Sequence, residues 1–246
     1  MESYILVSAF FIIALIYSSV GFGGGSSYLA LLAQPFFALL PETIKPIALL
    51  CNIVVVTGGV IIFYRKGELK WKEIWPFLVL SVPAAFIGGY WRLKESTFFI
   101  LLGITLLLAA IFLWIKPKQN VSKELSLTTL AGLGGGIGLL SGLVSIGGGI
   151  FLSPILHLIN WSTAKKISAL ASAFILVNSI SGLVGYFSAG GRAVNWGFAG
   201  PLLLAVFVGG QIGSRLGSQV FNAIYIRRIT AIVILVAAVN ILRDHL

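Results

Sequence analysis

The chain has 246 residues, of which 58% are hydrophobic and only 10% are charged, and its mean hydropathy is +1.04. Soluble domains carry about 25% charged residues, so this composition excludes a soluble globular protein and indicates a chain embedded in a lipid bilayer. The formal net charge of +10 does not indicate nucleic-acid binding, because the basic residues stand in short loops between apolar runs, as in the positive-inside loops of membrane proteins.

The start of the chain predicts a membrane helix rather than a cleavable signal peptide. It has no basic segment, carries Glu2 and continues directly into a glycine-rich segment. The single cysteine, Cys51, excludes a disulfide framework and a cysteine-based metal cluster.

Apolar runs separated by short polar segments fill the chain. They lie at about residues 3–40, 43–64, 73–91, 96–115, 125–159, 164–188, 196–214 and 229–242. A helix of about 20 residues spans the hydrocarbon core, so runs 3–40 and 125–159 are too long for one span. We therefore predict an all-α, polytopic (multi-pass) membrane protein in which these two runs are interrupted.

Three consecutive glycines break each of the long runs, at 23–25 and at 147–149. A helix in lipid must satisfy its own backbone, so such a break is costly unless the freed backbone lines a cavity. Discontinuous helices at corresponding places of two halves mark the substrate sites of secondary transporters. Glycines before the second break, among them Gly134, Gly138 and Gly142, stand at small-residue spacing, and we expect them to pack helices closely.

Further landmarks repeat at nearly the spacing of the two glycine triplets. The matching pairs are Thr57-Gly58 with Ser181-Gly182, Pro76 with Pro201, and Ile87-Gly88 with Ile212-Gly213. We therefore predict two homologous four-helix halves, residues 1–120 and 121–246, joined by the polar stretch 116–124.

The loop charges predict how the halves are oriented. If each break lay inside one straight span, lysine and arginine would divide almost evenly between the two membrane faces. If each break turns the chain back, most of them fall on one face, as the positive-inside rule requires. This favours a re-entrant, glycine-broken first helix in each half, an inverted repeat, and both termini on the outer face of the cell membrane.

The second break also carries a family resemblance. Residues 145–156 read SIGGGIFLSPIL, which resembles the signature of the sulfite exporter TauE/SafE family, also called toluene sulfonate uptake permeases. The first copy, residues 21–32, keeps the glycines but has Ser26 and Ser27 where apolar residues are usual. The resemblance covers the whole chain and implies a secondary transporter for sulfite, sulfonates or related organosulfur anions.

The chemistry of the breaks suits a small oxyanion, which needs fixed hydrogen-bond donors and a favourable potential. Glycine leaves backbone N–H groups accessible, and the N-terminus of a half-helix adds about half a positive charge. In an inverted repeat two such N-termini would converge near the midplane. The alternative is that the glycines only allow close helix packing. The candidate substrate-binding residues at the breaks are Gly23, Gly24, Gly25, Ser26, Ser27, Ser145, Gly147, Gly148 and Gly149.

Four polar side chains inside the apolar runs are further candidates. Asn52, Asn178 and Gln211 are costly in lipid unless they are paired or face a cavity, so their amides either donate to substrate or form interhelical hydrogen bonds. His157, near the second break, either has a proton or pH-sensing role or is structural.

The titratable residues limit the mechanism and the class of protein. Every acidic residue lies in or near a loop, which argues against cation transport and for a potential-assisted anion carrier, since an inside-negative potential drives each negative charge outward by about 2.3 kcal/mol per 100 mV. No set of residues suits catalysis or a metal, so we expect no enzyme and no cofactor. The alternative function is an anion channel, or a permease for another small anion. The expected partners are a small sulfur-containing anion and membrane lipid, without nucleic acid, and the chain could form a homo-oligomer.

Overall fold

The computed structural model describes residues 2–19, 21–115, 125–216 and 223–245, and within these ranges the chain forms helices and no strands. The polar stretch 116–124, which we expect to join the halves, lies outside the described residues. The helices are α1 (Glu2–Ser19), α2 (Gly25–Leu32), the 3-10 helix η1 (Pro35–Phe37), α3 (Pro41–Arg65), α4 (Trp71–Tyr90), α5 (Glu95–Trp114), α6 (Leu127–Val144), α7 (Gly149–Leu158), α8 (Ala164–Ser188), α9 (Trp196–Leu216) and α10 (Ala223–His245).

Six of these helices, α3 to α6, α8 and α9, are long and apolar enough to cross a membrane. The prediction of an all-α, multi-pass membrane protein is therefore confirmed. Both long apolar runs divide at their glycines, since α2 and α7 each begin within a triplet. The residues that precede these short helices, Gly24 and Gly148, have φ values of 75° and 80°, a left-handed conformation that glycine adopts at little cost.

The order of helices is the same on both sides of residue 120. Each side has the same five α-helices in order. They are a helix of 18 residues, a short helix of 8 or 10 residues, a helix of 25 residues and two helices of 20 to 23 residues. Helices at the same place in the two halves also have corresponding packing partners. Helix α1 packs against α9, and its counterpart α6 packs against α4. Helix α2 packs against α10, and its counterpart α7 packs against α5. Helices α4 and α9 therefore each pack within the other sequence half, and the two halves interlock.

Glycines allow the closest of these helix contacts. A Cβ atom on Gly134, Gly138 or Gly142 of α6 would overlap the backbone of α4, and one on Gly209 or Gly213 of α9 would overlap the backbone of α1. Lipid is as apolar as a leucine side chain, so close packing rather than apolar burial holds membrane helices together. The packing role expected for the glycines of α6 is confirmed for Gly134, Gly138 and Gly142, whereas a Cβ atom on Gly132 or Gly136 would meet nothing within 4 Å.

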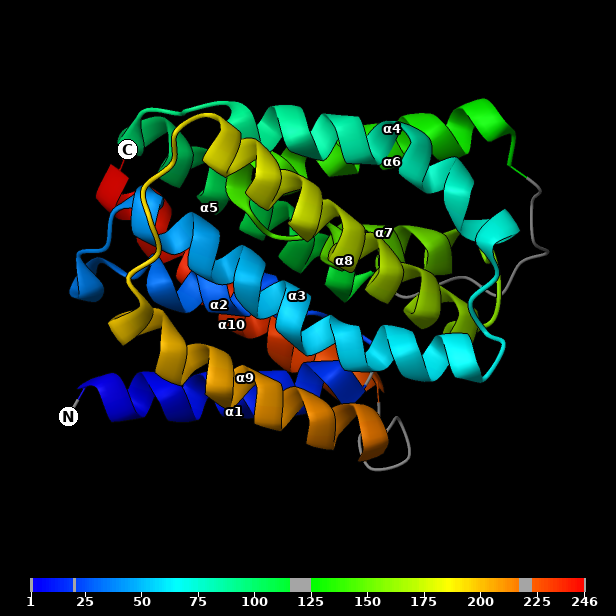
Figure 1. Ribbon diagram of the computed structural model, residues 1–246, viewed down its shortest axis with the longest axis horizontal. Helices are drawn as coiled ribbons and strands as arrows, with labels where there is room; N and C mark the ends of the chain where they lie inside the picture. Colours follow the sequence, from blue (N-terminus) through cyan, green and yellow to red (C-terminus); the bar gives the residue numbers. More distant parts are fainter. Residues whose placement is uncertain (1, 20, 116–124, 217–222, 246) are drawn as a thin grey trace.

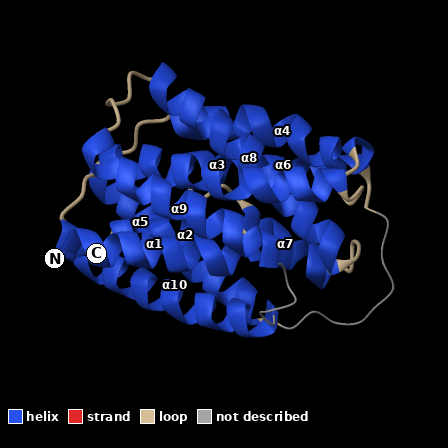
Figure 2. Cartoon of the chain, turned by 60° about the horizontal axis from the view of Figure 1, so that its bottom comes forward, coloured by secondary structure: helices blue, strands red, loops and turns tan. Residues whose placement is uncertain are grey.

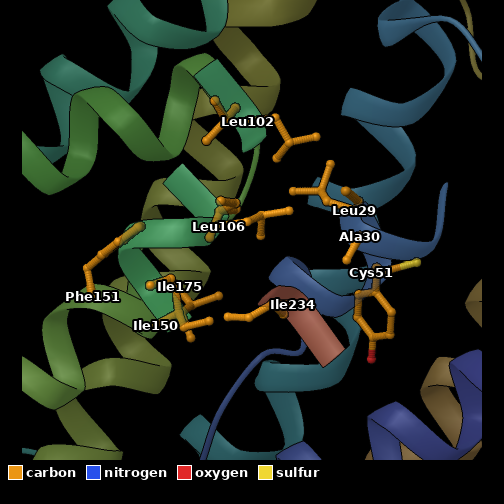
Figure 3. Close-up of a cluster of buried hydrophobic side chains, with 14 of the residues drawn as sticks. Leu29, Ala30, Cys51, Leu102, Leu106, Ile150, Phe151, Ile175 and Ile234 are labelled. Carbon is orange, nitrogen blue, oxygen red and sulfur yellow. The ribbon is translucent and has the colours of Figure 1, made fainter. Parts of the chain in front are cut away.

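The short helices α2 and α7 lie inside the bundle, where apolar side chains of α5, α8 and α10 surround them. Figure 3 shows this cluster, which includes Leu29, Ala30, Cys51, Leu102, Leu106, Ile150, Phe151, Ile175 and Ile234.

Both chain ends lie at the same end of the molecule, as Figures 1 and 2 show. The loops that join α4 to α5 and α8 to α9 lie at this end as well, and those that join α3 to α4 and α7 to α8 lie at the opposite end (Figure 1). Helix α1 starts at the end with the termini and α6 starts at the other end, so the two run in opposite directions (Figure 1).

Candidate functional site at the two glycine breaks

The N-terminus of α2 presents backbone donors that the helix does not use. The N–H groups of Ser27 and Tyr28 donate to the carbonyl of Gly24 at 2.9 and 3.0 Å. The N–H groups of Gly25 and Ser26 have no backbone acceptor within the described residues, as is usual for the first turn of a helix.

The N-terminus of α7 repeats this arrangement. The N–H groups of Phe151 and Leu152 donate to the carbonyl of Gly148 at 3.1 Å each. Those of Gly149 and Ile150 find no backbone acceptor in the described part of the chain. Each short helix therefore offers two free donors and the positive end of its dipole.

A small cavity lies against the N-terminus of α2, and the second break reaches it through Ile146 and Ile150. About 20 Å³ of it is open to the centre of a water molecule, and one buried water needs roughly 10–15 Å³ by this measure. The cavity as it stands therefore holds little more than one water and has to widen to admit an oxyanion. Its lining residues are Tyr17, Phe22, Gly23, Gly24, Gly25, Ser26, Leu113, Ile146, Ile150, Ile175 and Thr230.

Asn52 of α3 lies behind the cavity and connects the two breaks. Its Nδ2 donates to the carbonyl of Ile146 at 3.1 Å. A Cβ atom on Gly25 or Gly147 would overlap the Asn52 amide, so glycine at these two positions leaves room for that amide. Asn52 is fully buried and its Oδ1 has no hydrogen-bond partner among the described residues.

Ile175 of α8 occupies the place in the second half that Asn52 has in the first. A Cβ atom on Gly23 would contact both side chains, and so would one on Gly147. A Cβ atom on Gly149 would overlap Ile175, as one on Gly25 would overlap Asn52. The two breaks thus share one pair of neighbours, of which one is polar and one apolar.

The predicted serines have different surroundings. Ser26 lines the cavity, whereas the Ser27 hydroxyl shares a 2.6 Å hydrogen bond with the Tyr17 hydroxyl. Ser145 caps the C-terminus of α6 with a φ of 63°, and its buried Oγ has no partner among the described residues. A non-glycine residue in this conformation is strained, and such strain is concentrated at functional sites.

Of the predicted residues, only Gly23, Gly24, Gly25 and Ser26 line the cavity. Those that do not line it are Ser27, Asn52, Ser145, Gly147, Gly148, Gly149, Asn178, Gln211 and His157. Asn178 donates from Nδ2 to the carbonyl of Phe174 in its own helix at 2.8 Å. Gln211 of α9 lies against Gly58 of α3. His157 lies in the last turn of α7, about 12 Å along the helix axis from its N-terminus at 1.5 Å per residue.

Sequence reasoning missed Ser179. Its buried hydroxyl lies beside Gly147 and has no hydrogen-bond partner in the described part of the chain. A single serine in an apolar helix gives little signal in the sequence. In the structure it follows Ile175 by one helical turn, and both side chains lie beside Gly147. Among the described residues, no three side chains of histidine, cysteine, aspartate or glutamate lie together as a metal site would require.

Comparison with known proteins gives one family model and several relatives. The model described as "Sulfite exporter TauE/SafE" matches residues 6–241. The chain is similar to "Probable membrane transporter protein y4hK" of Sinorhizobium fredii, with 33% identity over 98% of each chain. It is also similar to "Probable membrane transporter protein YunE" of Bacillus subtilis, with 25% identity over 95% of this chain and 96% of that protein, and to "Probable membrane transporter protein MJ0441" of Methanocaldococcus jannaschii, with 27% identity over 88% and 85%. No solved structure matches the chain.

Proposed function

Since the chain belongs to the sulfite exporter TauE/SafE family and is a multi-pass membrane transporter, we propose that it carries a small sulfur-containing anion, sulfite or an organosulfonate, across the cell membrane. The anion binds to the free backbone N–H groups at the N-termini of α2 and α7. It is a secondary transporter, and the membrane potential assists the outward movement of its negative charge.

The observation that carries this proposal is the meeting of the two glycine breaks beside one cavity, which Gly25 and Ser26 line from the first break and Ile146 and Ile150 from the second. The N-terminus of each short helix contributes about half a positive charge and two N–H donors that have no backbone acceptor among the described residues. Among the described residues no carboxylate lines the cavity, so an anion there would meet no like charge from them. The apolar lining from Leu113, Ile150 and Ile175 suits the hydrocarbon part of a sulfonate.

Alternating access by an inverted repeat is the transport mechanism that we propose. The antiparallel course of α1 and α6 supports it (Figure 1), as does the equal order of helices in residues 1–120 and 121–246. Basic side chains at the end opposite the termini support a cytoplasmic position for that end; among them are Arg65, Lys66, Lys70, Lys165 and Lys166.

Transport by purified protein in liposomes tests the function. A potassium gradient sets the membrane potential, and sulfite, a small alkanesulfonate, sulfate and chloride are loaded in turn. We expect saturable, potential-dependent flux of sulfite or the sulfonate. Absence of flux for both sulfur anions from folded protein would contradict the substrate class, and single-channel conductance steps would indicate a channel instead of a carrier.

Two variants of Ser26 separate the backbone donor from the side chain. Ser26→Pro removes the N–H in the first turn of α2, where proline is tolerated, and Ser26→Ala keeps it. A hydrogen bond to a charged group contributes about 1.5–3 kcal/mol, so Ser26→Pro should weaken anion binding about 10- to 100-fold and Ser26→Ala much less. Ser96→Pro, at the same position of α5 and exposed, is the matched control. Equal flux from Ser26→Pro and Ser26→Ala would contradict backbone binding.

A further inference from the structure

Lys45 is a buried cation to which the protein supplies no counter-charge. It lies in the second turn of α3 and is 6% exposed. No carboxylate of the described residues lies within ion-pair distance of its Nζ. The ring of Phe98 on α5 lies near it, with its centroid 5.9 Å from Nζ. The Nζ atom itself is not among the fully buried unpaired atoms, but a charge in largely apolar surroundings is normally paired, and one ring face supplies only part of that stabilisation.

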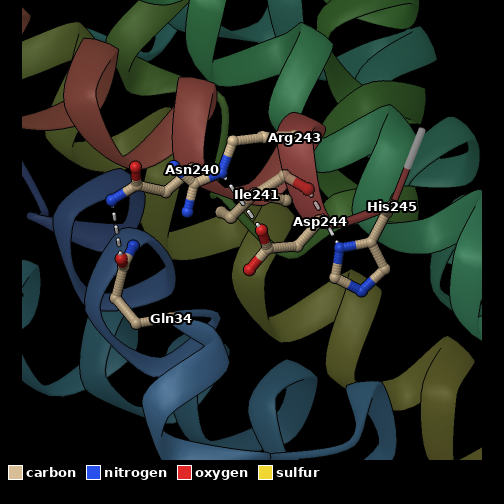
Figure 4. Close-up of polar contacts among 6 residues, drawn as sticks. All are labelled: Gln34, Asn240, Ile241, Arg243, Asp244 and His245. Carbon is tan, nitrogen blue, oxygen red and sulfur yellow. Dashed lines mark hydrogen bonds and ion pairs between the residues drawn. The ribbon is translucent and has the colours of Figure 1, made fainter.

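The carboxylates at the same end of the molecule have other partners or are exposed. Glu42 pairs with Arg192 at 2.9 Å, and Asp244 pairs with Arg243 at 3.4 Å. Figure 4 shows Asp244 and Arg243 in a group of polar contacts at the end of α10. Glu95 is exposed at the start of α5. None of these carboxylates therefore pairs with Lys45.

The other polar groups of this region also have partners. His245 approaches the carbonyl of Ile241 with Nδ1 at 2.9 Å, and Asn240 donates to Gln34 at 3.4 Å (Figure 4). Pro46 has no N–H, which leaves the carbonyl of the residue four positions earlier without a helical donor; the Tyr186 hydroxyl donates to that carbonyl at 2.8 Å. Within the described residues, Lys45 is thus a charged group that has no polar partner, whereas the polar groups named above have one.

The position of Lys45 connects it with the glycine breaks. It precedes Asn52 by two helical turns, about 10 Å along the axis, so both side chains leave the same face of α3. Asn52 contacts both breaks, and α3 begins at the end of the molecule with the chain termini (Figure 1). Lys45 therefore stands between the breaks and that end.

We propose that Lys45 forms a second binding station for the transported oxyanion, between the glycine breaks and the end of the molecule with the termini. This inference rests on the proposed transport of a small sulfur-containing anion. The ammonium group supplies a full positive charge, whereas the breaks supply backbone donors and helix dipoles. An oxyanion that leaves the breaks toward this end gains Lys45 as its counter-ion, and the lysine gains the partner that the chain lacks.

Substitution of Lys45 tests the station in the liposome assay. Lys45→Met keeps most of the length of the side chain but removes the charge, and Lys45→Arg keeps the charge. We expect Lys45→Met to raise the half-saturating sulfite concentration at least tenfold and Lys45→Arg to stay within a few-fold of the wild type. Lys94→Met, which removes an exposed lysine at the same end, should leave transport unchanged. Wild-type kinetics in Lys45→Met would overturn the inference.

A measurement on the wild-type protein removes the dependence on a folded variant. Lysines are acetylated slowly by a small acyl donor that reacts with amines. Mass spectrometry follows the modification with and without saturating sulfite. Sulfite should slow the modification of Lys45 several-fold and leave that of Lys94 unchanged; an unchanged rate at Lys45 would contradict the station. If the wild type transports no sulfur anion, the proposed function fails, whereas an active wild type with an indifferent Lys45 overturns only this inference.

Discussion

At the scale of single residues, Asn52 gives the glycines a second purpose. Triple glycines in an apolar run predict accessible backbone donors, and the glycines of the first break, but not those of the second, line a cavity. The space that the Asn52 amide occupies beside Gly25 and Gly147 could not be predicted, because the sequence does not reveal which helix packs behind the breaks.

Gly25→Ala tests this use of space. The new Cβ atom would overlap the Asn52 amide, and overpacking of this kind costs about 1–3 kcal/mol. We expect a clearly lower midpoint of thermal unfolding in detergent, and partial recovery in the double variant with Asn52→Ala. Gly200→Ala, where a Cβ atom meets nothing within 4 Å, is the control. A Gly25→Ala protein as stable as this control would contradict the packing of Asn52 against the break.

The polar side chains show where residue-level reasoning from sequence ends. An amide in an apolar run indicates a paired or functional group, and Asn52 does contact both breaks. The same argument cannot tell which face of a helix looks inward. Gln211 packs against Gly58 on another face of α3, and His157 stands at the far end of α7. The burial of the Lys45 side chain was not predicted, because a lysine near the end of an apolar run is normally interpreted as a loop charge.

At the scale of elements, hydrophobic runs predict the helices well and their partners poorly. The long helices fall within a few residues of the apolar runs, and the glycine triplets mark where α1 and α6 give way to α2 and α7. The small-residue spacing of α6 predicts a close helix contact but not its partner. That partner is α4, because the face of α4 that meets α6 leaves room for backbone contact at each glycine.

Gly138→Leu tests the contact between α4 and α6. A side chain there would enter the backbone of α4 at Ser81, and tight packing is the main force that associates membrane helices. We expect strong destabilisation or loss of folded protein, measured as the monodisperse fraction after heating. Gly136→Leu, on the same helix with nothing within 4 Å of its Cβ position, should fold normally. Equal behaviour of the two variants would show that α4 and α6 do not pack in this way.

At the scale of the whole molecule, the site depends on two halves that interlock. The first break belongs to residues 1–120 and the second to residues 121–246, and they meet because α4 and α9 each pack within the other half. Duplicated landmarks in the sequence predict two related halves, and loop charges predict their orientation. The exchange of α4 and α9 could not be predicted from the sequence, because the pattern of an apolar helix does not say which other helix it packs against.

The interlocked arrangement also limits how the cavity can open. Its lining includes Ser26 of α2 and Ile150 of α7, which belong to different halves, so movement of one half against the other would change its width. The proposed transport requires such widening, because the cavity holds little more than one water.

The measurement that tests the central claim most directly is the position of a bound anion. The protein is crystallised with selenite, a heavier analogue of sulfite, and the selenium is located by its anomalous scattering. We predict a peak between the N-termini of α2 and α7, with anion oxygens within hydrogen-bond distance of the N–H groups of Gly25, Ser26, Gly149 and Ile150. A protein that binds selenite in solution but places the selenium away from both breaks would contradict the account.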